Sequence, residues 1–144
     1  MIKKGFVVIL VAVVAIQFYP VDRTNPAITS EVEVDEEVMQ ILRRSCYDCH
    51  SNETVWPWYS YIAPISWLVA DDVHEAREHL NFSEWDKYDL QQRQHKLEEL
   101  VEEVDAGEMP LKKYVFMHPG TEVSDDEVNV LKSWAELYQM PGIN

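Results

Sequence analysis

Two thiols and an imidazole lie within one short string of this chain, Cys46-Tyr47-Asp48-Cys49-His50. The CxxCH spacing can present two sulfur atoms and a ring nitrogen to the same flat ligand within about one helical turn. The thiols can reach the two vinyl groups of a porphyrin, and the imidazole then falls on the iron. The string therefore predicts one covalently attached haem c, with Cys46 and Cys49 as attachment points and His50 as an axial ligand.

The same two cysteines leave other chemistry open. The chain has no further cysteine, so a zinc site would lack the second ligand pair that structural zinc sites usually have. A haem-free redox dithiol would explain the CxxC spacing but would leave His50 without a role.

An iron bound to His50 needs a sixth ligand from a distant segment, and Met109 is the first candidate. It is expected in a loop that begins after Gly107 and continues to Gly120, and Pro110 stiffens that loop. A thioether opposite a histidine raises the reduction potential and suits electron transfer. Core filling is the alternative role for this methionine.

Other side chains could take the sixth position instead. Met117 is the reserve, and ligation by His118 or His74 would lower the potential. Met39 lies too near the attachment site in sequence, and Met140 lies at the end of the chain. The aromatic residues that follow the CxxCH string could line the haem edge or belong to an ordinary core; they are Trp56, Trp58, Tyr59 and Tyr61.

The N-terminus has the pattern of an export signal. Lys3 and Lys4 precede an unbroken apolar run over residues 6–16. The run is short for a full span, although the aromatic residues after it could extend it at the interface. We expect residues 1–20 to form an uncleaved signal anchor, with a cleaved signal peptide as the alternative. The domain would then be anchored to the inner membrane and face the periplasm or the cell exterior.

The rest of the chain divides into a tether over residues 21–34 and a domain over residues 35–144. Apolar residues at helical spacing predict four helices in the domain and no strand. Capping residues, including a capping box that opens with Ser124, support the boundaries. These helices run from Asp35 to Cys46, from Pro64 to Leu80, from Ser83 or Asp86 to Val104, and from Ser124 to Tyr138, with Pro141 and Gly142 ending the last.

The charge balance restricts the partners. The formal net charge is −14, which repels phosphate backbones and makes nucleic-acid binding improbable. An acidic surface would instead attract a redox partner protein with a basic docking patch.

The order of helix, CxxCH, intervening helices, Met-Pro loop and final helix resembles class I cytochromes c. The chain is more similar to bacterial haem-binding domain proteins that are short, single-haem and membrane-anchored, over residues 36–138. The resemblance implies haem c on Cys46 and Cys49, with His50 axial and Met109 as the loop methionine. Residues 51–80 are longer and more aromatic than a minimal cytochrome c needs. The matching strings are Cys46–Thr54, Trp56–Ser60, Ala63-Pro64, Leu80–Trp85 and Gly107–Pro110.

We therefore expect an all-α, cytochrome c-like bundle of about four helices around one covalent haem, preceded by a membrane-anchor helix. The expected function is electron transfer through His50/Met109-ligated iron, without enzymatic activity. A haem-based redox or gas sensor with a labile sixth ligand is the alternative. A peroxidase-like activity would need a positioned acid–base residue, and the sequence identifies none.

Overall fold

The computed structural model describes residues 2–139. Within that range the regular structure is helical, apart from one isolated β-bridge between Ser30 and Glu84. The predicted all-α class is therefore confirmed for the described part of the chain. The elements are α1 Ile2–Ile16, α2 Glu36–Ser45, α3 Tyr47–His50, η1 Trp58–Tyr61, α4 Ile65–His79, η2 Trp85–Lys87, α5 Leu90–Asp105, α6 Lys112–Met117 and α7 Asp125–Gln139, where η denotes a 3-10 helix.

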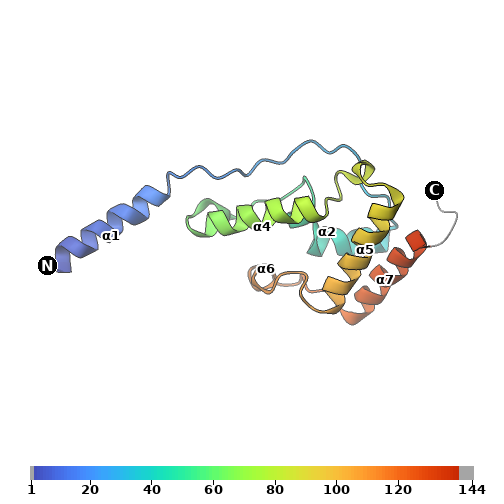
Figure 1. Ribbon diagram of the computed structural model, residues 1–144. Helices are drawn as coiled ribbons and strands as arrows, with labels where there is room; N and C mark the ends of the chain where they lie inside the picture. The colour runs from blue at the N-terminus through green and yellow to red at the C-terminus, as the bar shows by residue number, and fades with distance from the viewer. Residues whose placement is uncertain (1, 140–144) are drawn as a thin grey trace.

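The four predicted domain helices correspond to α2, α4, α5 and α7. The caps explain two of the starts. The Asp35 side chain accepts a hydrogen bond from Val38 N at 2.9 Å at the start of α2, and Ser124 N donates to Glu127 Oε2 at 2.9 Å before α7. Helices α5 and α7 lie side by side (Figure 1). Pro141 and Gly142, the expected end of the last helix, lie outside the described residues.

The third domain helix begins later than predicted. Asp89 caps α5 through a reciprocal pair of bonds: its carboxylate accepts from Gln92 N, and its own N–H donates to Gln92 Oε1, both at 2.9 Å. Ser83 cannot serve as this cap, because it is fully buried and its hydroxyl accepts a hydrogen bond from Asn52 N at 3.0 Å. The short 3-10 helix η2 lies between Ser83 and Asp89.

The expected loop between Gly107 and Gly120 also differs, because it contains the short helix α6. The Leu111 carbonyl accepts hydrogen bonds from Tyr114 N at 2.8 Å and Val115 N at 3.0 Å, which starts the helical turn. A single helical turn is too short to show a periodic pattern in the sequence.

The core joins the CxxCH segment to the other helices. Tyr47 lies within that segment and stacks on Phe82, with ring centroids 5.5 Å apart. Phe82 and the three leucines of α2, α5 and α7 are fully buried, and they are Leu42, Leu97 and Leu131. The residues on either side of Tyr47 are thus held by the core.

Helix α1 stands apart from the other helices, and the segment after it runs past α4 toward the far end of the domain (Figure 1). This segment packs against the domain and is not a free tether. Val32 is 2% exposed, and its N–H donates to the Phe82 carbonyl at 3.0 Å. Across residues 2–139, no helix has the length and hydropathy needed to cross a membrane.

Candidate functional site

A cavity of about 630 Å³ opens between the CxxCH segment, α4, α5 and α6. Its volume falls in the range of about 300–1,000 Å³ that is usual for cofactor and small-molecule sites. All four residues predicted to hold a haem line this cavity, and they are Cys46, Cys49, His50 and Met109. The fold thus brings a methionine from beyond α5 to the same space as the two thiols and the imidazole.

The helix break at Cys46 presents the CxxCH side chains to the cavity. Cys46 N donates to Leu42 O at 2.8 Å and so ends α2. The Cys46 carbonyl then accepts hydrogen bonds from Cys49 N at 3.1 Å and His50 N at 2.9 Å, which form the single turn of α3. One turn therefore carries both thiols and the imidazole.

The ring of His50 is oriented by the main chain of Leu80, whose carbonyl lies 3.0 Å from Nδ1. A carbonyl oxygen can only accept, so Nδ1 carries the hydrogen and Nε2 keeps a free lone pair. A backbone carbonyl bonded to the other ring nitrogen, as Leu80 O is here, is the kind of group that orients metal-bound histidines. Burial lowers the pKa of His50, against the opposing effect of the Leu80 and Ala76 carbonyls, and so favours the neutral, ligating form.

Burial disfavours the thiolate form of both cysteines. Burial raises the pKa of both Cys46 and Cys49 to about 12, and neighbouring negative groups add to the effect. Both cysteines are free. Reactive redox cysteines need a depressed pKa, so this environment favours the haem interpretation over the haem-free dithiol.

Met109 reaches the cavity through a turn at the end of α5. Gly107 has a φ of 69°, in the left-handed region that glycine adopts at little cost. The Glu103 carbonyl then accepts hydrogen bonds from Glu108 N at 3.0 Å and Met109 N at 3.1 Å. These bonds fold the chain back over the last turn of α5 and place Met109 beside the cavity.

The reserve ligands are not part of the cavity wall. Met117 is 43% exposed, and neither it nor His74 lines the space. His118 is engaged elsewhere: its Nδ1–H donates to Tyr114 O at 3.1 Å, and its Nε2 accepts from the Tyr59 hydroxyl at 3.4 Å. Met39 packs against the core, and Met140 lies outside the described residues. The four aromatic residues after the CxxCH string are also absent from the lining.

Among the cavity residues that were not predicted from the sequence are Tyr114 and His79. Tyr114 of α6 donates a hydrogen bond to Asp48 Oδ2 at 2.8 Å, and burial, followed by this bond to Asp48, raises its pKa. The position of α6 was unknown, so no sequence signal indicated this pair. His79 also lines the cavity, and its helical spacing with Asp72 and Glu75 could have indicated a shared face.

The charged residues of the cavity wall are mainly acidic. Two lysines also contribute to it, Lys96 and Lys113, and the ammonium group of Lys113 lies 2.8 Å from a carboxylate oxygen of Asp72. Over the described residues, no group of three or more His, Cys, Asp or Glu side chains could hold a metal ion. The acidic residues are Asp72, Glu75, Glu99, Glu102 and Glu103.

Comparison with known proteins gives one match. Residues 11–137 match a family model described as a haem-binding domain. No curated protein and no solved structure matches the chain.

Proposed function

Because the chain belongs to the haem-binding domain family, we propose that it is a monohaem c-type cytochrome that carries electrons. The observation that carries the proposal is the shared cavity, which is lined by the CxxCH side chains and by Met109. Family membership supports a haem cofactor, while covalent attachment, the sixth ligand and electron transfer are inferences from the cavity.

The residues of the cavity fit a haem. A porphyrin needs a space of several hundred Å³, and the cavity offers about 630 Å³. An axial histidine needs a neutral ring with a free nitrogen, which the bond from His50 Nδ1 to Leu80 O leaves at Nε2. Two unlinked thiols and one thioether complete the set of expected donors.

Attachment would use the thiols of Cys46 and Cys49. The two thiols would hold the haem through thioether links, formed by addition of each S–H to a vinyl group with no atom lost. Forming these links needs no oxidant, and both cysteines are free.

The bound iron would supply a reversible one-electron change. His50 would bind the iron through Nε2, and Met109 would bind it through sulfur and favour the reduced state. The remaining cavity residues would exclude water and set the local charge. Electron transfer through such an iron needs no residue to give a proton to a substrate or take one from it, so we propose a carrier.

We further propose that residues 1–20 attach the protein to the inner membrane and that the domain faces the periplasm or the cell exterior. The support is the basic start of the chain followed by an apolar helix, in which residues 6–11 are each more than half exposed. The proposed partner is a redox protein with a basic docking patch, because the chain carries a formal net charge of −14.

A haemochrome assay tests covalent attachment. The full chain is expressed with export and haem maturation, and its pyridine haemochrome spectrum is recorded after acid–acetone extraction of free haem. We expect one haem that resists extraction, and a spectrum shifted toward that of a free-vinyl haem in Cys46→Ala or Cys49→Ala. Met117→Ala is the matched control and should keep the wild-type spectrum. A colourless wild-type protein would refute the proposal.

Carbon monoxide distinguishes the carrier from a gas sensor. A six-coordinate His50/Met109 iron should bind carbon monoxide slowly in the reduced wild type and rapidly in Met109→Ala, because the thioether blocks the site. Rapid binding already in the wild type would favour the sensor.

A further inference from the structure

Five aromatic and aliphatic side chains are exposed where α1 meets the domain. Phe18 is 82% exposed, Tyr19 67% and Tyr61 60%. Ile62 is 44% exposed and Trp67 is 37% exposed. We call this set the aromatic patch. Its members come from the residues just after α1, from η1 and the residue after it, and from the first turn of α4.

Side-chain contacts join the two halves of the aromatic patch. The Gln17 amide nitrogen donates to Ala63 O at 3.1 Å, and Ala63 N donates to Gln17 Oε1 at 3.0 Å. The rings of Tyr19 and Trp67 meet edge to face, with centroids 5.8 Å apart. The residues that follow α1 are thus fastened to the domain beside α4.

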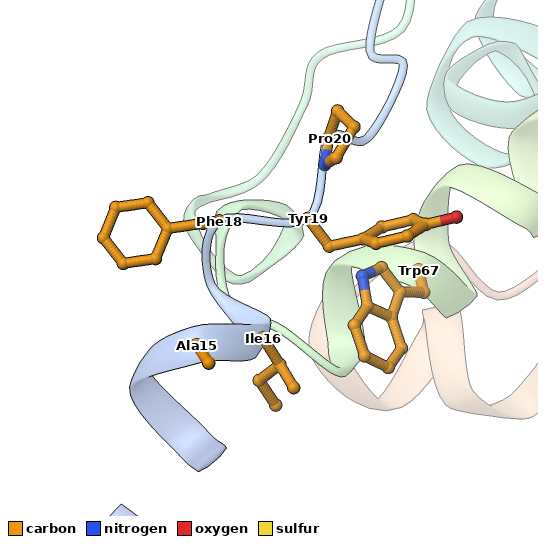
Figure 2. A pocket seen from close by; sticks show the side chains of 6 residues that line it. All are labelled: Ala15, Ile16, Phe18, Tyr19, Pro20 and Trp67. Carbon is orange, nitrogen blue, oxygen red and sulfur yellow. The ribbon is translucent and has the colours of Figure 1, made fainter. Parts of the chain in front are cut away.

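A shallow apolar hollow of about 450 Å³ lies within this surface. Figure 2 shows the ring of Tyr19 over Trp67, the side chain of Ile16 on the same side, and Phe18 directed away from them. Every lining residue is apolar or aromatic; they are Ala15, Ile16, Phe18, Tyr19, Pro20 and Trp67.

The aromatic patch is free of charge in a strongly acidic chain. Residues 5–20 and residues 55–70 contain no charged side chain, although the formal net charge is −14. One cation stands at the edge: the Arg23 guanidinium lies 4.5 Å from the Tyr61 ring centre and donates to Ser60 O at 3.2 Å. Asp22 beside it is exposed, so the edge of the patch carries one positive and one negative side chain.

We propose that the aromatic patch docks on the interfacial layer of a lipid bilayer, beside the proposed attachment through residues 1–20. Tyrosine and tryptophan prefer this layer, because their rings are apolar and their tips can bond to water and headgroups. An exposed apolar surface that continues from the apolar run over residues 6–16 fits a membrane better than a soluble partner. Arg23 is placed to meet lipid phosphate.

Docking would determine how the domain sits on the membrane. The links between Gln17 and Ala63 leave no free linker between α1 and this end of the domain. The η1–α4 end would therefore face the bilayer, and the domain would not turn freely about a tether. The inference rests on the proposed attachment through residues 1–20 and adds a second contact to it.

Vesicle flotation tests the proposal. The full, haem-loaded chain is titrated with phosphatidylcholine vesicles, which avoid the repulsion that anionic lipid would exert on this acidic protein. We expect the double variant Ile62→Ser/Trp67→Ser to bind with a partition coefficient about tenfold lower than the wild type. The matched control is Leu90→Ser/Leu137→Ser, whose side chains are 44% and 45% exposed on α5 and α7, and it should bind like the wild type.

Each other outcome has a definite meaning. If the wild type floats and the patch variant floats equally well, the docking proposal is wrong and the attachment through residues 1–20 stands. If the wild type does not float, both membrane proposals are wrong, while the haem spectrum of the same sample still tests attachment of the cofactor. If the patch variant instead converts a dimer to a monomer in sedimentation, a second copy of the chain covers the patch. Far-UV circular dichroism of both variants must match the wild type.

Discussion

At the scale of single residues, His50 and Met109 reach the cavity by different means. His50 follows Cys49 directly in α3, so its position depends on local helical geometry, while its ring orientation depends on the distant carbonyl of Leu80. Met109 depends on a glycine turn and on the Glu103 carbonyl at the end of α5. Changing either ligand should therefore affect the proposed iron site without unfolding the core.

Met109→Ala should remove the weak sulfur-to-iron absorption band of the oxidised protein. The reduction potential should also fall by on the order of 100 mV, because axial ligands set haem potentials over about 0.8 V and loss of the thioether favours the oxidised state. Absorption spectroscopy and a redox titration measure the two effects. Met117→Ala should change neither, since Met117 lies outside the cavity. Retention of the band in Met109→Ala would assign the sulfur to another residue.

At the scale of secondary-structure elements, α2 and α7 are joined by an ion pair beside the CxxCH segment. Arg44 donates from its two terminal nitrogens to the Glu127 oxygens, at 2.7 and 3.0 Å. The bond from Arg44, assisted by Ser124 N, lowers the pKa of Glu127 to about 2 from its ordinary value of 4.5. Arg44 directly precedes Ser45 and Cys46, so this pair holds the end of α2 against the last helix.

The pair should contribute stability that acid removes. A carboxylate with a depressed folded-state pKa stabilises the protein above its unfolded pKa, and this contribution is lost as the pH falls from 4.5 toward 2. The Arg44 side chain is 39% exposed, so solvent reduces the effect to about 1 kcal/mol. Urea unfolding of wild type and Glu127→Gln should differ by that amount at pH 7 and converge near pH 2.

Glu136→Gln is the control for this experiment, because Glu136 is an exposed residue of the same helix. It should unfold like the wild type across the pH range. A constant difference between wild type and Glu127→Gln down to pH 2 would show that the ion pair is not the cause.

At the scale of the whole molecule, the segment over residues 21–34 is part of the fold. It was expected to be a tether, because it has no helical or strand period. Its backbone nevertheless bonds to the residues around Phe82: Thr29 N donates to Ser83 O at 3.0 Å, and Val32 N donates to Phe82 O at 3.0 Å. The segment also joins α4, where Arg77 donates to Thr24 O at 3.0 Å.

Val32→Ala should lower the free energy of unfolding by about 2 kcal/mol, because it leaves a small cavity in the core at a side chain that is 2% exposed. Val55→Ala, at a side chain that is 74% exposed, should change stability by less than about 0.5 kcal/mol. Thermal or urea unfolding measures both. Equal stability of the two variants would mean that the segment is a loose tether.

The acidic charge should control the rate of electron exchange. Five carboxylates and two lysines line the cavity, and the chain has a formal net charge of −14. A cationic metal complex should therefore reduce or oxidise the protein faster than an anionic complex of similar potential, and added salt should slow the first and speed the second. Stopped-flow absorption at several ionic strengths measures both rates. Rates that do not depend on salt would exclude electrostatic steering.

Much of the fold could be predicted from the sequence because its signals are local. The CxxCH spacing lies within one helical turn. The Asp35 cap of α2 bonds to Val38, three residues later. Apolar periodicity marked the four longer helices of the domain. Errors arose where a long-range contact decides the structure. Helix α5 begins later than predicted because Ser83 is buried and bonded to Asn52. Helix α6 was missed because so short a helix has no apolar periodicity in the sequence.

The residue types of the proposed site, its charge and its helical class were thus determined by the sequence alone, since neighbouring residues specify them. Only the tertiary structure decided that Met109 shares a cavity with Cys46 and Cys49. It also decided that Leu80 O directs the His50 ring and that Tyr114 bonds to Asp48. The physical reason is that these contacts join residues far apart in the chain, and packing of the core brings such residues together.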